Sequence, residues 1–130
     1  IFNYFLNEGN PIDSVIHFAG LKSVEESTLK PLLYWDSNIN ATLTLLKVME
    51  YFNCNKIVFS SSATIYKPNS LKKLDEDSDL EPINSYGNSK LAIEKILFDL
   101  FCSNEKWKIV SLRYFNPVGC HSSGMLGEDP

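Results

Sequence analysis

A tyrosine and a lysine are the residues of this chain whose types and spacing best suit chemistry. They lie four positions apart in Ser85-Tyr-Gly-Asn-Ser-Lys-Leu91, within a stretch whose apolar spacing predicts a helix. Residues four apart share one face of a helix, so the phenol of Tyr86 and the ammonium of Lys90 would be neighbours. A phenol titrates near about pH 10, and a nearby cation lowers that pKa by favouring the phenolate. The pair therefore predicts a general acid/base.

This tyrosine–lysine spacing is also common on helix surfaces, so a solvent-facing pair is the competing interpretation. A serine favours the chemical one. Ser62 follows the apolar run Lys56-Ile-Val-Phe-Ser60, which predicts a buried strand. A hydroxyl at the end of that strand can hydrogen-bond the substrate oxygen that Tyr86 would deprotonate. We therefore take Ser62, Tyr86 and Lys90 as candidate catalytic residues, whereas the two serines before Ser62, taken alone, indicate a strand-end turn.

The elements that must position these residues alternate between strand and helix. Strands are expected at 13–20, 56–60 and 107–114, and helices at 31–53 and 85–103. Connections of this length join parallel strands through right-handed crossovers, which predicts a doubly wound α/β sheet. In the first helix, the predicted buried stripe consists of Leu32, Trp35, Ile39, Leu43, Leu46 and Met49.

The carboxyl ends of parallel strands meet at one edge of a sheet, where ligands bind. Those ends are the segments 18–22, 60–64 and 113–117, and we expect them side by side. The charge-dense segment 67–84 is expected to be a surface loop.

Composition limits the possible functions. The chain has 130 residues, of which 44% are hydrophobic and 22% charged, and this indicates one globular domain. A net charge of −4 argues against an electrostatic nucleic-acid binder. No apolar run approaches the roughly 20 residues that span a bilayer, and no signal peptide is visible. We expect a cytoplasmic protein with no membrane segment.

The cysteines predict no metal site. Cys54, Cys102 and Cys120 form no C-x-x-C pair, and neither His17 nor His121 lies at ligand spacing from a thiol. Reduced thiols are the expected state, with at least one of them in the core.

Several segments carry a more specific resemblance. These are His17-Phe-Ala-Gly-Leu-Lys22, Phe59-Ser-Ser-Ser-Ala-Thr-Ile-Tyr66, Ser85-Tyr-Gly-Asn-Ser-Lys-Leu91, Leu112-Arg-Tyr-Phe-Asn-Pro-Val-Gly119 and Gly127-Glu-Asp-Pro130. With Ser62, Tyr86 and Lys90, they resemble the extended branch of the short-chain dehydrogenase/reductase family, and within it the nucleotide-sugar 4-epimerases. The related 4,6-dehydratases differ after the second strand, where Thr-Asp-Glu stands in place of Ser62-Ala-Thr64. The implied fold is a partial, Rossmann-like NAD-binding domain over residues 1–130.

The resemblance implies an isomerase that interconverts UDP-galactose and UDP-glucose with tightly bound NAD, in galactose metabolism. Tyr86 would take the proton of the sugar 4-hydroxyl while hydride leaves C4 for the nicotinamide. The 4-keto sugar would then turn over, and hydride would return to its other face. Ser62 would share the hydrogen bond to the 4-hydroxyl, and Lys90 would hold the nicotinamide ribose.

The resemblance also implies binding residues. The cofactor-binding set is Phe18, Ala19, Gly20, Leu21, Lys22, Ser37, Ser60, Tyr86, Lys90 and Phe115, and the substrate-binding set is Lys22, Ser62, Tyr86 and Asn116. Gly20 suits its role because a residue without Cβ permits a close approach. Asn116 would contact the substrate phosphates. For Phe115, a place in the core is an equally good interpretation.

The chain departs from the family pattern at three points. Ser37 stands where relatives have Asn, and Lys67 stands where they have Gly. The G-x-x-G-x-x-G turn that binds the pyrophosphate is absent. We therefore expect an interior piece that lacks the first βαβ unit and the C-terminal substrate region and is inactive alone. The residue that controls acceptance of N-acetylated sugars is expected beyond Pro130.

Alternatives remain open at this point. The chain could come from another extended-family enzyme, such as a uronate epimerase or a dehydratase, or be a truncated chain with a structural or binding role. Family members pair the helices at 31–53 and 85–103 across a two-fold axis, which implies a homodimer. Both helices carry apolar residues beyond one stripe: Leu33, Val48, Phe52, Leu91, Phe98 and Phe101.

Overall fold

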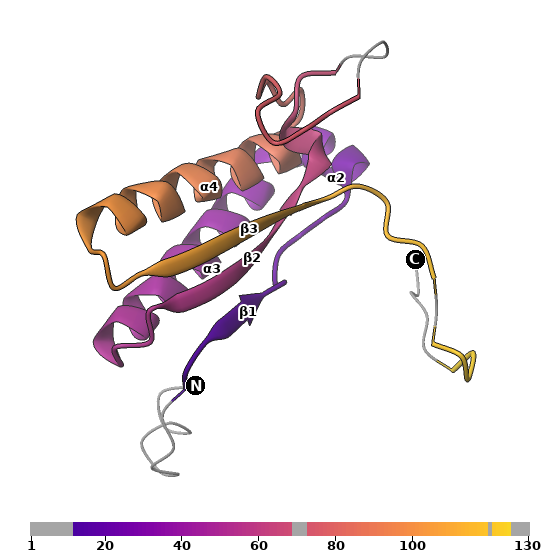
Figure 1. Ribbon diagram of the computed structural model, residues 1–130. Helices are drawn as coiled ribbons and strands as arrows, with labels where there is room; N and C mark the ends of the chain where they lie inside the picture. Colours follow the sequence, from indigo (N-terminus) through magenta and orange to yellow (C-terminus); the bar gives the residue numbers. More distant parts are fainter. Residues whose placement is uncertain (1–11, 69–72, 120, 126–130) are drawn as a thin grey trace.

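The computed structural model describes residues 12–68, 73–119 and 121–125 (Figure 1). The elements are β1 (Val15–His17), α2 (Val24–Leu29), α3 (Pro31–Tyr51), β2 (Lys56–Ser62), the 3-10 helix η1 (Ala63–Ile65), α4 (Ser85–Ser103) and β3 (Lys108–Tyr114). The predicted alternation of strand and helix is confirmed, although β1 is shorter than the expected 13–20. Cys120 and the segment 127–130 lie outside the described residues.

Helix α2 was not predicted from the sequence. Its signal is the Ser23-x-x-Glu26 spacing typical of a helix start, and the Ser23 side chain does accept a hydrogen bond from Glu26 N at 3.2 Å. The helix is only six residues long, so its apolar periodicity is too short to detect.

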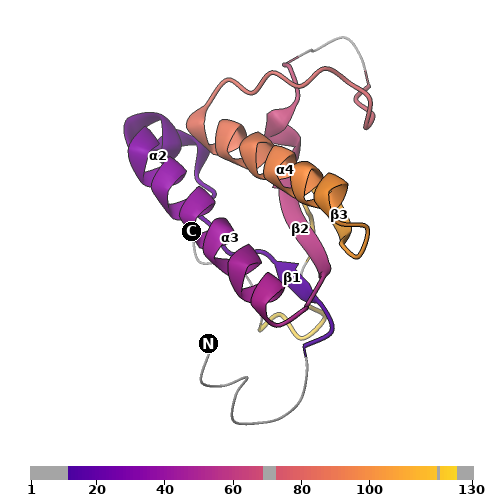
Figure 2. The same ribbon diagram turned by 90° about the vertical axis from the view of Figure 1, so that its left-hand side faces the viewer.

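The three strands form one parallel sheet in the order β1-β2-β3. Figure 2 shows that α3 and α4 lie side by side on the same face of this sheet. The chain steps across the sheet in one direction, so two right-handed crossovers place both helices on one side. The parallel sheet flanked by helices is confirmed. The second helical layer of a doubly wound sheet is not present in the part of the chain that the structure describes.

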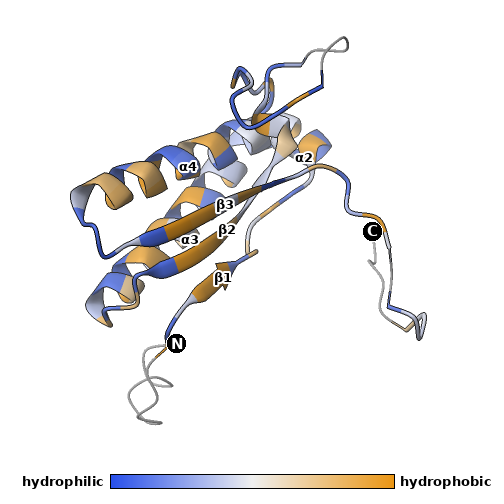
Figure 3. Ribbon diagram, in the orientation of Figure 1, coloured by the Kyte–Doolittle hydropathy of each residue, from blue (hydrophilic) through white to orange (hydrophobic). Residues whose placement is uncertain are grey.

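The core lies between the sheet and the α3–α4 layer. Its buried members are Leu46, Met49, Cys54, Ile57, Phe59, Ile93, Leu97 and Trp107. Hydrophobic residues run along the middle of β2 and β3 (Figure 3). On the opposite face of the sheet, Ile16, Val110 and Leu112 are exposed. The described residues therefore cover the sheet on one face only.

The buried stripe of α3 differs from the predicted one in its first half. Leu32 is 81% exposed, and Trp35 is also exposed. Tyr34, Asn38 and Thr42 are buried instead, and the stripe returns to apolar residues only at Leu46 and Met49. The prediction counted apolar residues alone, whereas the first half of α3 packs against polar groups at the carboxyl edge of the sheet. Its ends follow expectation: Pro31 opens the helix, and Asn53 beyond it takes a left-handed φ of 56°.

The loop between η1 and α4 is on the surface, as predicted, in its described parts 67–68 and 73–84. Backbone pairing between Tyr66 and Leu80 and an ion pair of 2.7 Å between Lys67 and Glu81 hold it together.

Membrane and metal features were searched over the described ranges. No helix there is long and apolar enough to cross a membrane. No group of His, Cys, Asp or Glu side chains in the same ranges could hold a metal ion. Cys54 is a buried free thiol, and Cys102 is an exposed one.

The Ile93 side chain tests the described core. Ile93→Ala in the full-length protein should lower the free energy of unfolding by about 2–5 kcal/mol, because Ile93 is 1% exposed and its loss leaves a cavity. The measurement is urea unfolding followed by tryptophan fluorescence. Ile83→Ala is the matched control, because Ile83 is 76% exposed and should change stability by less than about 0.5 kcal/mol. Equal effects of the two variants would contradict this core.

Candidate active site

The end of β2 carries the candidate serine. Ser62 is buried at the start of η1, where its Oγ accepts hydrogen bonds from Thr64 N at 3.2 Å and from Thr64 Oγ1 at 3.0 Å. A hydroxyl oxygen that accepts two hydrogen bonds still has its own proton to donate. Ser62 is therefore held in place by its neighbour while remaining a donor for a ligand oxygen.

The first turns of α4 carry the candidate tyrosine and lysine. Both Tyr86 and Lys90 are buried, and the Lys90 Nζ lies 5.8 Å from the centroid of the Tyr86 ring. The same Nζ donates to the Ser60 carbonyl at 2.8 Å and lies 4.9 Å from the centroid of the Phe59 ring. The predicted same-face pair is confirmed, and it lies directly against the end of β2.

Burial determines the electrostatics of this lysine. The Lys90 side chain is 4% exposed, and the loss of solvation lowers its pKa to about 8. The group is therefore mainly charged at neutral pH but loses its proton within the physiological range. A cation there stabilises negative charge that develops on a phenol oxygen as its proton leaves.

Helix α4 approaches the η1 turn after β2 closely because of a glycine. A Cβ at Gly87 would lie 2.6 Å from the Thr64 carbonyl oxygen and 2.9 Å from the Cβ of Pro82. The helix also begins with a side-chain cap, since Asn84 Oδ1 accepts from Gly87 N at 2.8 Å. The Tyr-Gly-Asn-Ser-Lys sequence thus places its own helix start against the η1 turn that follows Ser62.

The segment after β1 passes beside Lys90 at Gly20. The φ of Gly20 is +148°, and a Cβ there would lie 3.0 Å from Asn38 Oδ1 and 3.9 Å from Lys90 Nζ. Only glycine takes this backbone conformation without strain and fits this space. The structure thus explains the glycine at this position by its backbone conformation and by the nearness of Asn38 and the Lys90 ammonium, while the close approach of a cofactor to Gly20 stays a prediction. These features fit a bound nicotinamide nucleotide.

Asn38 of α3 joins this helix to the segment after β1 and to α4. Its Oδ1 accepts from Leu21 N at 2.8 Å, while its Nδ2 donates to Leu21 O and to Ser89 Oγ, both at 3.1 Å. Sequence reasoning selected the neighbouring Ser37, which is half-buried, and its cofactor role stays a prediction. Asn38 could have been noticed as a polar residue on the face of the helix that packs on the sheet. A count of apolar residues does not include it.

His17 extends the same polar group of residues. Its Nε2 lies 2.9 Å from Thr42 Oγ1, and the Thr42 hydroxyl donates to the Asn38 carbonyl at 2.8 Å. Because the Thr42 hydroxyl proton is donated to the Asn38 carbonyl, His17 Nε2 is the donor in its hydrogen bond to Thr42 Oγ1. Burial, with a smaller contribution from Lys90, lowers the pKa of His17, so the ring is neutral.

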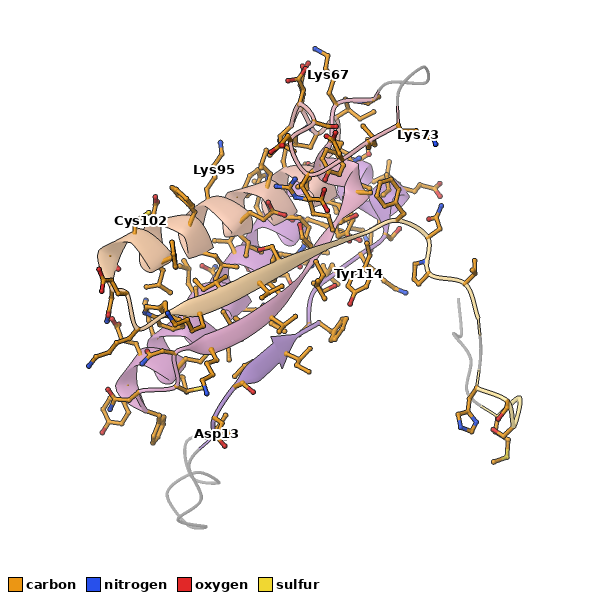
Figure 4. All side chains as sticks on the ribbon, in the orientation of Figure 1. Asp13, Lys67, Lys73, Lys95, Cys102 and Tyr114 are labelled. Carbon is orange, nitrogen blue, oxygen red and sulfur yellow. The ribbon has the colours of Figure 1, made fainter. Side chains whose placement is uncertain are left out.

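The outer candidates lie at the open end of the site. Figure 4 shows Tyr114 at the carboxyl end of β3, far from Asp13 at the amino end of the sheet. Phe18 is exposed beside it, with 6.1 Å between the two ring centroids. Phe115 is 62% exposed and lies 6.4 Å from the Tyr66 ring centroid, so it is not part of the core that the described residues form. The remaining candidates Ala19, Lys22 and Asn116 are exposed along these segments.

The arrangement can perform acid–base chemistry on a bound alcohol or carbonyl. Ser62 and the Tyr86–Lys90 pair come from neighbouring elements that meet at the carboxyl edge of a parallel sheet, where such folds bind ligands. The structure brings Gly20, Ser60, Tyr86 and Lys90 into one place. For Ser37 and Asn116, it shows no more than their position near this edge.

Comparisons with known proteins agree with this arrangement. A UDP-glucose 4-epimerase from Oryza sativa subsp. japonica is 53% identical over 118 residues, which cover 91% of this chain and 29% of the rice protein. The UDP-glucose 4-epimerase of Dictyostelium discoideum is 52% identical over 123 residues, covering 95% of this chain and 36% of that protein. The chain thus spans about a third of the length of such relatives.

A solved structure and a family model are also similar to this chain. The chain is similar to UDP-glucose 4-epimerase from Bifidobacterium longum in complex with NAD+ and UDP, with a TM-score of 0.90 and 52% identity over 97% of this chain and 38% of that one. The model of the NAD dependent epimerase/dehydratase family matches residues 3–128. With its candidate residues gathered at the carboxyl edge of a parallel sheet, the chain belongs to the NAD dependent epimerase/dehydratase family.

Proposed function

We propose that the full-length protein is a UDP-glucose 4-epimerase that interconverts UDP-galactose and UDP-glucose. The observation that carries this proposal is the buried Tyr86–Lys90 pair, which is bonded to the Ser60 carbonyl two residues before Ser62 and lies beside Gly20. The names of the similar proteins support the same reaction, as does the structure from Bifidobacterium longum with NAD+ and UDP. Turnover requires more of the protein than this chain, because the pyrophosphate-binding glycine turn is absent from it.

The residues of this chain supply the proton chemistry and the orientation. Ser62 donates a hydrogen bond to the sugar 4-hydroxyl oxygen and holds it toward Tyr86. The Tyr86 oxygen takes the proton from that hydroxyl and later returns it, while the buried Lys90 ammonium stabilises the negative charge on the phenol oxygen. When bound, NAD accepts and returns the hydride at sugar C4.

The residues that would hold the cofactor come from three elements. Gly20 and its neighbours after β1 give a close backbone approach, and Lys90 offers its ammonium from α4. Phe115 presents an exposed ring after β3. The cofactor roles of Phe18, Ala19, Leu21, Lys22, Ser37 and Ser60 and the substrate role of Asn116 belong to the same proposal. A reducing, cytoplasmic location is also part of it, since Cys54 and Cys102 are free thiols.

Removing the Tyr86 hydroxyl tests the proposed general acid/base. Tyr86→Phe in the full-length enzyme should lower kcat for UDP-galactose at least about a hundredfold, the size typical of such groups, while NAD stays bound. The measurements are turnover and the NAD content of the purified protein. Tyr51→Phe is the matched control, since it removes the hydroxyl of an exposed tyrosine at the end of α3. Near-normal turnover by Tyr86→Phe would show that another group moves the proton.

The pH dependence follows from the buried lysine. Burial lowers the pKa of Lys90 from 10.5 to about 8, so the ammonium is lost as pH rises through that value. Because the charge on the phenol oxygen depends on that cation, kcat should fall above about pH 8. A pH–rate profile measures this, and Lys106→Met, which removes an exposed lysine near the far end of α4, should keep the same alkaline limb. A profile that stays flat through pH 10 would contradict the role of Lys90.

The proposal includes a homodimer formed through the outward faces of α3 and α4. Leu33, Phe98 and Phe101 are exposed on these two neighbouring helices, and Phe98 is 65% exposed. A helix that covers a sheet needs one apolar face, so a second one indicates a further partner.

The oligomeric state tests this part of the proposal. Light scattering of the full-length protein at micromolar concentration should give the mass of a dimer. Phe98→Lys should shift the mass toward the monomer, because it places a charge in the proposed interface. The control Ile83→Lys changes an exposed residue of the loop before α4 and should leave the dimer intact. A monomeric wild-type protein would refute the dimer.

A further inference from the structure

Arg113 lies near the carboxyl end of β3 and is the centre of a cluster with Glu94 and Tyr66. Its Nε donates to Glu94 Oε1 at 3.1 Å, and its Nη2 donates to Glu94 Oε2 at 2.8 Å. The Nη1 donates to Tyr66 OH at 3.1 Å, and the guanidinium carbon lies 5.1 Å from the Tyr66 ring centroid. The Arg113 side chain thus bonds both oxygens of the Glu94 carboxylate, and it contacts Tyr66 both at the hydroxyl and over the ring.

The environment makes this cluster stronger than a surface ion pair. Both charged side chains are largely removed from solvent, so the attraction between them is poorly screened. The paired arginine–carboxylate geometry is directional as well as strong. The hydrogen bonds to Glu94 outweigh the cost of burial and raise the pKa of Arg113, so its charge is permanent.

Each partner in the cluster belongs to a segment that carries a candidate site residue. Glu94 lies on α4, one turn beyond Lys90. Tyr66 is buried and follows the η1 turn that Ser62 begins. Arg113 itself lies two residues before Phe115, whose ring is stacked on Tyr66 with 6.4 Å between centroids.

The loop before α4 is attached to the same guanidinium. The Arg113 Nη1 donates to the Glu76 carbonyl at 3.0 Å, and this loop leads to Asn84, which caps the helix start. Arg113 is therefore bonded to α4 itself, through Glu94, and to the loop that precedes α4, through the Glu76 carbonyl.

We propose that Arg113 is a positioning residue, which holds the ends of β2 and β3 and the start of α4 in one arrangement so that Ser62 and Tyr86 face the substrate and Phe115 faces the cofactor. This inference rests on the proposed function, since it assigns how that site is kept in order. Arg113 acts through Glu94 and Tyr66 and needs no contact with the substrate itself.

A lysine cannot replace this arginine. The fork of the guanidinium reaches the carboxylate, the phenol and the carbonyl at the same time, whereas an ammonium is a single point of charge. Arg113→Lys therefore keeps the positive charge but cannot make the hydrogen bonds to Glu94, Tyr66 and the Glu76 carbonyl at the same time. Tyr66→Phe is milder, because it removes one hydrogen bond and keeps the buried ring.

The experiment uses the full-length protein with Arg113→Lys, Tyr66→Phe and the matched control Glu81→Gln. The control breaks the exposed ion pair between Lys67 and Glu81 in the same loop without touching the cluster. We measure kcat and KM for UDP-galactose, the melting temperature, and hydrogen exchange of the backbone amides in the absence of substrate.

Arg113→Lys should lower kcat by about tenfold or more, with KM changed by less than about threefold, because misplaced groups slow the reaction more than they weaken binding. Exchange should become faster at Ser62 and in segments 63–68 and 73–90, and stay unchanged at 57–60 in the middle of β2. Tyr66→Phe should give a smaller loss of kcat in the same direction, and Glu81→Gln should match the wild type.

Three results would overturn the inference. In the first, kcat per folded molecule and exchange in Arg113→Lys equal those of the control. In the second, exchange rises uniformly over the whole sheet and kcat falls only with the folded fraction, which is a general loss of stability. In the third, Arg113→Lys does not fold and Tyr66→Phe keeps full turnover. If the wild-type protein does not convert UDP-galactose, the proposed function fails instead, and the exchange data alone decide the role of Arg113.

Discussion

The burial of one ammonium group is the constraint on which the candidate site depends. Lys90 loses nearly all of its solvation, and a buried cation is costly unless its surroundings compensate for that loss. The compensation comes from the Ser60 carbonyl and the Phe59 ring of β2 and from the Tyr86 ring on its own helix. These partners hold α4 against the end of β2, so the position of the charge and the geometry of the site are determined together.

A second consequence is that the domain has two kinds of interior. Away from the site, Trp107, Ile57 and Leu97 belong to an ordinary apolar core. Toward the carboxyl edge of the sheet, Asn38 and Thr42 take the place of apolar residues. Asn38 pairs with the segment after β1 and with α4, and Thr42 pairs with His17 of β1. Buried polar groups of this kind cost free energy unless they are hydrogen-bonded, so they fix one arrangement of the elements.

The sheet is covered on one face by α3 and α4, while Ile16, Val110 and Leu112 are exposed on the other. Parallel sheets in α/β proteins are covered on both faces. The chain spans about a third of the length of relatives of the same family, and their structures are similar to it over nearly its full length. The matched segment is one part of those longer chains, and the candidate acid–base residues of this chain lie within it.

Much of this arrangement follows from the sequence by itself. The spacing of Tyr86 and Lys90 determined that they share a helix face, and the order of apolar segments determined that the ends of the three strands meet. Apolar periodicity carries that information because it records which side of each element is buried. Apolar periodicity missed Asn38 and the cluster around Arg113, because a polar residue shows no periodic signal. The partners of Asn38 also lie 17 to 51 residues away along the chain, and those of Arg113 lie 19 to 47 residues away. The contacts of Asn38 and Arg113 are therefore determined by the tertiary structure alone, because a buried polar group is stable only where the folded chain places a hydrogen-bond partner beside it.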